Sequence, residues 1–413
     1  MRLLQINPVL RATTSTGRIM HEIADMVTAS GWESWLAYSK GRDGVPEDKS
    51  HLLPVGGRLS VGVHWALTRL FDLHGKGSRI ATRRFVRRLR ELDPDVIHIH
   101  NIHGYFLNYE ILFDYLKQSG KPVIWTVHDC WLFTGHCYHY ASVGCGKWCS
   151  HCSDCPQRTA FPRSWLLDRS YRNFEDKRRA FLSVPDITFV TVSEWMKGEM
   201  KKSFLGGCDI RVIHNGIDTD VFSPQPGPDL REHPSIGTRN IILGVASIWS
   251  REKGLDDFIT LDGRIDRDRE VIVLVGITAA QKALLPSGIV AVERTADVRE
   301  LAACYSEAAA LVNPTWQDNY PTVNMEAISC GTPVITYRTG GSVEVIPPET
   351  GFVVEQGDVD GLLDRIRAVE AAGKERYAES CRRFALANFG KAENYRKYLE
   401  LYNQRVDESS SGR

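Results

Sequence analysis

Short apolar segments alternate with longer helical patterns along almost the whole chain of 413 residues. Val123–Val127 and Val271–Val275 are nearly continuous apolar runs, whereas Arg79–Leu92 repeats apolar residues at helical spacing. A strand that is buried on both faces reads as an apolar run, and regular strand–helix alternation produces parallel sheets. The chain is too long for one hydrophobic core. We therefore predict an α/β fold with two doubly wound parallel sheets.

A polar segment rich in proline and glycine divides this alternation into two halves. We place an N-terminal domain at residues 1–222, a linker at residues 223–238 and a second domain at residues 239–388. Residues 389–413 are predicted to form a last helix with a frayed polar tail. The predicted strands are Leu3–Ile6, Trp35–Tyr38, Val96–Ile99, Val123–Val127, Ile187–Val192, Ile210–Ile213, Ile241–Ala246, Val271–Val275, Ile289–Val292, Ala310–Val312, Val334–Thr336 and Phe352–Val354.

The composition excludes some classes of protein. The formal net charge is zero, which disfavours a dedicated nucleic-acid binder. No apolar run approaches the ~20 residues that cross a bilayer. The N-terminus reads as a first strand and not as a signal peptide. We expect a cytoplasmic protein, either free or on the inner face of the membrane, with its ten cysteines reduced, buried or bound to metal.

The stretch Asn313–Val345 carries the most specific pattern of the chain. Asp318 and Glu326 stand eight positions apart, and a proline-containing loop and the start of a helix lie between them. A strand and a Gly-Gly turn follow. This order places free N–H groups, a carboxylate and flexible glycines at the carboxyl edge of a parallel sheet, where such sheets bind ligands. The start of a helix favours a phosphate there.

With these motifs the stretch resembles the nucleotide-diphosphosugar site of the family 4 retaining glycosyltransferases. That family has two glutamates at this spacing, so Asp318 is a departure from its pattern. The resemblance implies the GT-B fold, in which two Rossmann-like domains face each other across a cleft and the last helix crosses back to the first domain. It also implies transfer of a sugar from a UDP- or GDP-linked donor to a saccharide acceptor, free or lipid-linked, in exopolysaccharide, capsule or O-antigen biosynthesis.

The resemblance assigns roles to individual residues. Arg251 and Lys253 would stabilise the departing diphosphate, where cations suit the growing negative charge. Glu326 would bind the ribose and Asp318 the sugar. The implied donor-binding set is Gly17, Arg251, Lys253, Asn319, Tyr320, Pro321, Thr322, Val323 and Glu326, and the implied catalytic set is His128, Asp318, Arg251 and Lys253. No catalytic metal is expected. Gly17 taken alone also fits a simple turn.

A predicted strand delivers His128 and Asp129 to the carboxyl edge of the first sheet. Either a substrate contact or a structural role fits His128, and the resemblance favours the contact. His98, His100 and His103 lie near the end of a neighbouring strand. They are candidates for the acceptor side, although strand alternation would send some of them into the core or onto the surface.

An insert at residues 130–158 concentrates six of the ten cysteines. Thiolates at such close spacings form tetrahedral zinc sites. Some family 4 members have a similar insert, and the resemblance maps four ligands onto Cys137, Cys145, Cys152 and Cys155. Cys149 is an alternative ligand, as are His136, His139 and His151. We expect structural zinc. Packed free thiols are the main alternative, and an iron–sulfur cluster is a third, less favoured because nothing else in the sequence indicates redox chemistry.

The predicted helix Arg79–Leu92 carries Arg83, Arg84, Arg87 and Arg88. A basic amphipathic helix lies either on an anionic membrane surface or over the protein core with a solvated outer face. Two further hypotheses concern the whole chain. It could be a zinc-containing binding or scaffold protein with a decayed transferase site, or, less in keeping with its charge, a nucleic-acid-binding zinc module.

Overall fold

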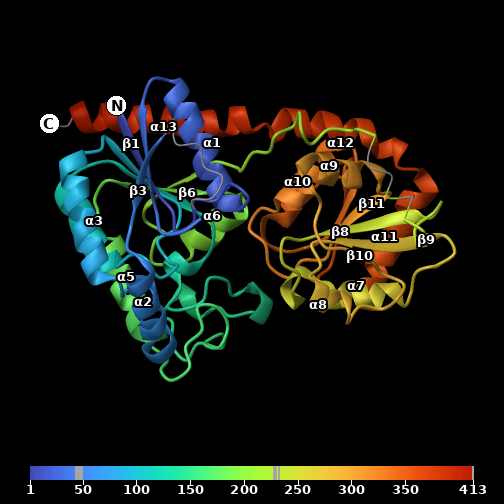
Figure 1. Cartoon of the computed structure of the whole chain (residues 1–413), viewed down its shortest axis with the longest axis horizontal. Helices are drawn as coiled ribbons and strands as arrows, with labels where there is room; N and C mark the ends of the chain where they lie inside the picture. The colour runs from blue at the N-terminus through green and yellow to red at the C-terminus, as the bar shows by residue number, and fades with distance from the viewer. Residues whose placement is uncertain (42–49, 227–229, 231–232, 412–413) are drawn as a thin grey trace. The chain divides into compact units, whose positions relative to one another are not determined.

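The computed structural model describes residues 1–41, 50–226, 230 and 233–411. The chain forms two compact units (Figure 1). Unit 1 contains Met1–His214 and Tyr395–Arg413, and unit 2 contains Asn215–Asn394. Within the described ranges, no helix is both long enough and apolar enough to span a membrane.

Unit 1 is built on a seven-stranded parallel sheet with the order β3-β2-β1-β4-β5-β6-β7. Its strands are β1 (Arg2–Ile6), β2 (Glu33–Tyr38), β3 (His51–Pro54), β4 (Val96–Ile99), β5 (Val123–Val127), β6 (Ile187–Thr191) and β7 (Asp209–Val212). Its helices are α1 (Ser15–Ala29), α2 (Arg58–Phe71), α3 (Arg79–Leu92), α4 (Tyr109–Ser119), α5 (Ser170–Phe181) and α6 (Glu194–Lys201). The central strands β4, β5 and β6 are buried along their whole length, which explains their apolar sequences.

Helices cover both faces of this sheet (Figure 1). On one face α3, α4 and α5 pack through residues such as Phe85, Phe113 and Phe181. On the other face α1 packs beside α13 (Lys391–Ser411), whose Tyr398 and Tyr402 are fully buried. The last helix therefore returns to the first domain, as the family resemblance implies.

Unit 2 has a six-stranded parallel sheet with the order β10-β9-β8-β11-β12-β13. The strands are β8 (Asn240–Val245), β9 (Glu270–Val275), β10 (Val290–Val292), β11 (Ala310–Asn313), β12 (Val334–Tyr337) and β13 (Gly351–Val354). The helices are α7 (Leu255–Asp262), α8 (Ala279–Lys282), α9 (Val298–Glu307), α10 (Thr322–Ser329), α11 (Val359–Ala372) and α12 (Glu375–Asn388). Side chains cap several of these helices, among them the Asp297 carboxylate at the start of α9.

The prediction of two doubly wound parallel sheets is confirmed. The predicted strands agree with the observed ones to within one residue at each end, except that β2 begins two residues before the predicted Trp35. The sequence analysis missed β3, a four-residue edge strand with a polar start. The tail is also more ordered than predicted, because α13 continues through residues 407–411. Residues 227–229, 231–232 and 412–413, which belong to the predicted linker and tail, lie outside the described residues.

Candidate active site

The order of strands reverses between β8 and β11 in unit 2, and the loops that leave these two strands form the candidate donor site. The two loops are fixed to each other, because the Trp316 N–H donates to the Glu252 carbonyl at 2.9 Å. Gly254 has a left-handed φ of 77°, and a Cβ at this position would lie 2.3 Å from the Pro314 carbonyl oxygen. Only glycine fits this crossing without strain.

A cation and a carboxylate meet where these loops touch. Lys253 Nζ lies 2.7 Å from Asp318 Oδ2, although the residues are 65 positions apart in the sequence. The other Asp318 oxygen accepts from the Tyr320 N–H at 3.3 Å. Both side chains are partly exposed. Arg251 lies one residue before Glu252 in the same short turn and is exposed. The predicted residues on these two loops therefore do come together.

The second predicted carboxylate is deeper. Glu326 lies on α10, is 4% exposed and accepts a hydrogen bond from the Tyr305 hydroxyl at 2.9 Å. Burial and the neighbouring Glu326 carboxylate hold the pKa of Tyr305 well above its usual range, so this hydroxyl stays a donor. α10 begins at Thr322, directly after Pro321, and no side chain of a described residue caps it. Its first N–H groups have no partner within the helix, and the loop that carries Asp318 leads directly into this helix start.

Sequence reasoning missed a buried polar network under this site. The Asn313 amide donates to Asn324 at 2.8 Å, and the Asn324 amide donates to the Ser342 hydroxyl at 3.1 Å. Ser342 and Thr336 exchange a further hydrogen bond at 2.7 Å. The network ties the end of β11 to α10 and to the turn after β12. Asn324 stands between Val323 and Glu326 in the sequence. Its amide on an otherwise apolar helix face was the feature from which this buried network could have been predicted.

In unit 1, His128 follows β5 at the carboxyl edge of the sheet, as predicted. His128 Nε2 lies 3.2 Å from His100 Nδ1, and His100 Nε2 lies 2.9 Å from the Gln5 amide oxygen. Because that amide oxygen only accepts, His100 must donate from Nε2, and its Nδ1 is then the acceptor. His128 therefore donates to His100, which assigns the proton of the neutral His128 to Nε2. Burial lowers the pKa of His128 to about 4; the Asp129 carboxylate opposes this shift, and His103 adds to it. His128 is therefore uncharged at neutral pH.

The remaining candidate histidines have different positions. His98 is fully buried and contacts the Tyr402 hydroxyl at 2.6 Å, so it is a core residue. His100 is also fully buried and reaches the edge only through His128. His103 is partly exposed and its Nε2 lies 2.7 Å from Asp129 Oδ2. His103 thus remains a candidate for a substrate contact, whereas His98 does not.

Gly17, the remaining predicted donor residue, also belongs to unit 1. It is buried in the first turn of α1, and a Cβ there would lie 2.2 Å from the Arg11 carbonyl oxygen. Packing against the preceding loop is therefore enough to require glycine. This close approach to backbone explains the residue without a ligand.

The cysteine-rich insert forms a series of short turns within unit 1. The four predicted ligands, Cys137, Cys145, Cys152 and Cys155, line one enclosed space of about 10 Å³. Cys149 is exposed and lies outside it. Among the described residues, no group of three or more His, Cys, Asp or Glu side chains is arranged to hold a metal ion.

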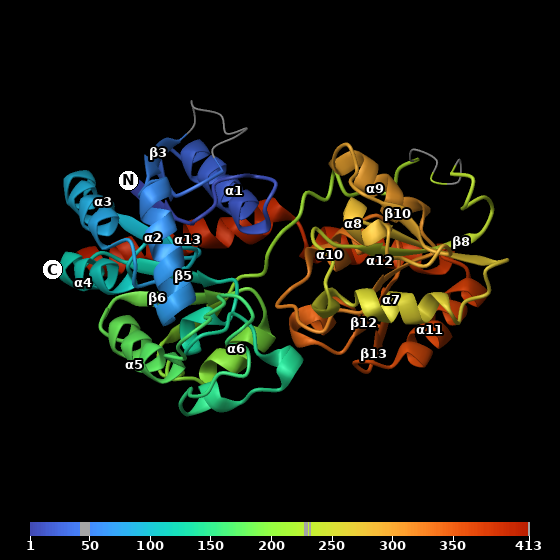
Figure 2. The same ribbon diagram turned by 60° about the horizontal axis from the view of Figure 1, so that its bottom comes forward.

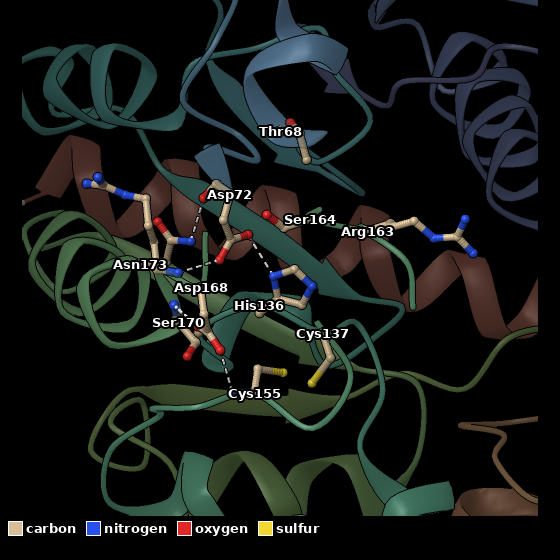
Figure 3. Close-up of polar contacts among 12 residues, drawn as sticks. Thr68, Asp72, His136, Cys137, Cys155, Arg163, Ser164, Asp168, Ser170 and Asn173 are labelled. Carbon is tan, nitrogen blue, oxygen red and sulfur yellow. Dashed lines mark hydrogen bonds and ion pairs between the residues drawn. The ribbon is translucent and has the colours of Figure 1, made fainter. Parts of the chain in front are cut away.

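A buried ion pair connects the insert to Asp72, the residue that follows α2. His136 Nδ1 lies 2.7 Å from Asp72 Oδ1, and both side chains are fully buried (Figure 3). The other Asp72 oxygen accepts from the Arg169 N–H at 2.8 Å. The Cys137 and Cys155 sulfurs turn toward each other beside this pair (Figure 3). Of the alternative zinc ligands, His151 is paired with Glu175, because His151 Nε2 lies 2.9 Å from Glu175 Oε1.

Comparisons with known proteins match both units. The Glycosyltransferase Family 4 model matches residues 16–221, and the model for glycosyl transferases group 1 matches residues 239–371. WcaC of Escherichia coli, assigned to colanic acid biosynthesis as a glycosyl transferase, is 26% identical over 88% of this chain and 89% of its own length.

Solved structures agree on the fold. Sucrose-phosphate synthase from Thermosynechococcus elongatus superposes with a TM-score of 0.71 at 16% identity, covering 98% of each chain. Anabaena Alr3699/HepE, solved in complex with UDP, gives a TM-score of 0.70 at 14% identity over 98% of this chain and 100% of that one. The two family matches, the full-length relative and the two doubly wound sheets agree: this chain belongs to the family 4 glycosyltransferases of GT-B fold.

Proposed function

We propose that this glycosyltransferase moves a sugar from a nucleoside-diphosphate donor to a saccharide acceptor, with retention of configuration, in exopolysaccharide, capsule or O-antigen biosynthesis. The observation that carries the proposal is the meeting of Lys253 and Asp318 beside the open start of α10. The relative WcaC supports the pathway, and HepE, which was also solved with UDP-glucose, supports the donor class.

The donor diphosphate would lie against the start of α10 and the Lys253 ammonium. Both groups favour the negative charge that grows as the glycosidic bond breaks. Arg251 is exposed on the same turn and would add a second cation. In the free enzyme Lys253 is paired with Asp318. We infer that Lys253 pairs with the diphosphate when the donor binds. The Asp318 carboxylate can then accept a hydrogen bond from a sugar hydroxyl.

The other predicted residues complete the donor pocket. Glu326 would accept from the ribose hydroxyls, and the Tyr305 hydroxyl would keep its carboxylate oriented. Asn319, Tyr320, Pro321, Thr322 and Val323 would offer backbone groups to the donor. His128 would meet the substrate as a neutral imidazole. We assign no nucleophile, so retention would follow from attack on the same face, with the leaving phosphate taking the acceptor proton.

The first test is a thermal-shift screen with UDP, GDP, ADP and CMP. A ligand at 100 times its dissociation constant stabilises the folded state by about 2.7 kcal/mol, which is easily measured. We expect one diphosphate to shift the wild type and to shift Lys253→Met and Glu326→Gln much less. Lys282→Met, an exposed lysine of the same unit, is the matched control.

The screen also separates this proposal from its alternative. If no nucleotide shifts protein that melts cooperatively, the decayed-site scaffold becomes the better account. If a nucleotide binds, the anomeric configuration of the transferred sugar, read by NMR from the product, tests retention. An inverted product would refute the same-face mechanism while leaving the donor site intact.

We further propose that the insert carries a structural zinc ion bound by Cys137, Cys145, Cys152 and Cys155. Their shared enclosed space supports this set over one that contains Cys149. Because these side chains are not at ligating geometry, they would have to close around the ion. His136 is the rival ligand, since its Nε2 is buried without a hydrogen-bond partner among the described residues while Asp72 orients the ring.

Metal analysis of the purified protein tests the zinc proposal. We expect about one zinc per chain, which Cys152→Ser would abolish and Cys208→Ser, outside the insert, would not. His136→Ala would retain the metal if the four cysteines are the ligands. Wild-type protein that is free of zinc and has all six thiols of the insert titratable after unfolding would establish packed free cysteines instead.

A further inference from the structure

Helix α2 has the reverse of the usual amphipathic arrangement. Its fully buried side chains are the polar His64 and Thr68. Its exposed side chains include Leu59, which is 83% exposed, and Val63, which is 52% exposed. A helix on a solvated surface places polar residues outward and apolar residues inward. The outer face of α2 is therefore built to meet something less polar than water.

The polar inner face has a clear structural reason. His64 Nε2 accepts from the backbone N–H groups of Gly75 and Gly77, at 3.1 and 3.3 Å. The ring thus pairs two donors of the tight turn that leads into α3. No comparable internal demand explains the outward apolar residues. Figure 2 shows α2 at the outside of unit 1.

Basic side chains from α3 stand next to this apolar face. A groove of about 1000 Å³ runs between α2 and α3. The cations that line it are Arg58, Lys76, Arg79, Arg83, Arg84 and Arg88, and no acidic residue is among the described residues that line it. Lys76 is paired with Asp176 and Glu110, but the arginines are exposed. Residues 54–90 contain nine Lys and Arg and one acid, Asp72, which is buried against His136.

The apolar surface continues past the C-terminal half of α2. Trp65 packs edge-on against Trp165, with ring centroids 5.6 Å apart, and the Arg69 guanidinium lies over both rings. Leu166 and Leu167 follow and are exposed. Tryptophan and arginine side chains of this kind are typical of membrane–water interfaces, because each combines an apolar body with a polar group.

We infer that unit 1 docks on an anionic lipid bilayer through α2, the arginines of α3 and the 165–167 segment. The apolar residues of α2 and the two tryptophans would enter the level of the headgroups, and the arginines would contact lipid phosphates. The absence of acids from the described lining of the groove fits an anionic partner. This extends the basic-helix prediction: Arg83, Arg84 and Arg88 line the groove, and α2 supplies the apolar half that the sequence did not reveal.

Co-sedimentation with vesicles tests the inference. The wild type is expected to bind vesicles made of equal parts phosphatidylglycerol and phosphatidylcholine, and to bind pure phosphatidylcholine much more weakly. Replacing Arg83, Arg84 and Arg88 together with glutamine should lower the affinity by roughly five-fold per arginine. The matched control replaces three exposed arginines of unit 2, Arg294, Arg299 and Arg383, and should bind as the wild type does.

The apolar contribution has its own matched pair. Leu59→Ser should weaken binding to the anionic vesicles several-fold, whereas Leu284→Ser, at an equally exposed leucine of unit 2, should not. Thermal melting and nucleotide binding without vesicles should stay unchanged in all variants. A failure of the donor proposal would appear in nucleotide binding, whereas a failure of the membrane inference would appear in vesicle binding. Wild type that ignores anionic vesicles overturns the inference. The inference is also overturned if light scattering shows a dimer that Leu59→Ser converts to a monomer, because α2 would then bind a second copy of the chain.

Discussion

The histidine under α2 should make unit 1 sensitive to acid. His64 can accept from the Gly75 and Gly77 N–H groups only while its Nε2 carries no proton. Burial lowers its pKa from 6.5 to about 4, against an opposing hydrogen bond with the Tyr105 backbone. The unfolded chain therefore binds a proton between these two pKa values that the folded chain does not, so stability falls as the pH is lowered through this window.

The size of the effect follows from the shift. With 1.36 kcal/mol for each pKa unit, His64 alone should cost the folded state about 2 kcal/mol between pH 7 and pH 5, and about 3 kcal/mol by pH 4. His74, His98 and His100, whose pKa values burial also lowers, act in the same direction. The wild type should therefore lose more than the His64 contribution.

Urea unfolding followed by tryptophan fluorescence measures this loss, because eight of the ten tryptophans belong to unit 1. His64→Gln provides an acceptor oxygen but no titrating group. It should lose about 2 kcal/mol less than the wild type between pH 7 and pH 5. The control His51→Gln changes an exposed histidine of the same unit and should keep the wild-type dependence. Equal pH dependence in the wild type and His64→Gln would refute the reasoning.

Two further predictions concern packing. Gly254→Ala should destabilise unit 2 by at least about 2 kcal/mol, because φ is left-handed and the new Cβ would meet the Pro314 carbonyl. Thermal melting would show it, and Gly263→Ala, where the nearest atom is 3.5 Å away, should be nearly neutral. Tyr402→Phe removes the partner of a buried His98 nitrogen and should cost about 1–3 kcal/mol, with faster hydrogen exchange in α13. Unchanged exchange there would show that the hydroxyl does not hold the helix.

Much of the fold was predictable because strands buried on both faces must be apolar, whatever they pack against. That rule located β4, β5 and β9 almost to the residue. It failed for β3, which lies at the edge of its sheet and buries few side chains. The sequence grouped Asp318 with Glu326 because one continuous segment carries both, and the family resemblance added Lys253 to the same candidate site. It could not show that Lys253 and Asp318 pair directly, because these residues are 65 positions apart and meet only in the folded chain.

Sequence by itself determined the strand–helix alternation, the two sheets and the motif of Asn313–Val345, because each depends on residues that lie close together along the chain. Only the tertiary structure decided which histidines are core residues and which reach the sheet edge. It also decided that α2 turns His64 inward and its leucine and valine side chains outward. The physical reason is that the partners of His64 are backbone N–H groups of a turn, which no side-chain pattern records. Helical periodicity shows that a helix has two faces, but its neighbours in space decide which face is buried.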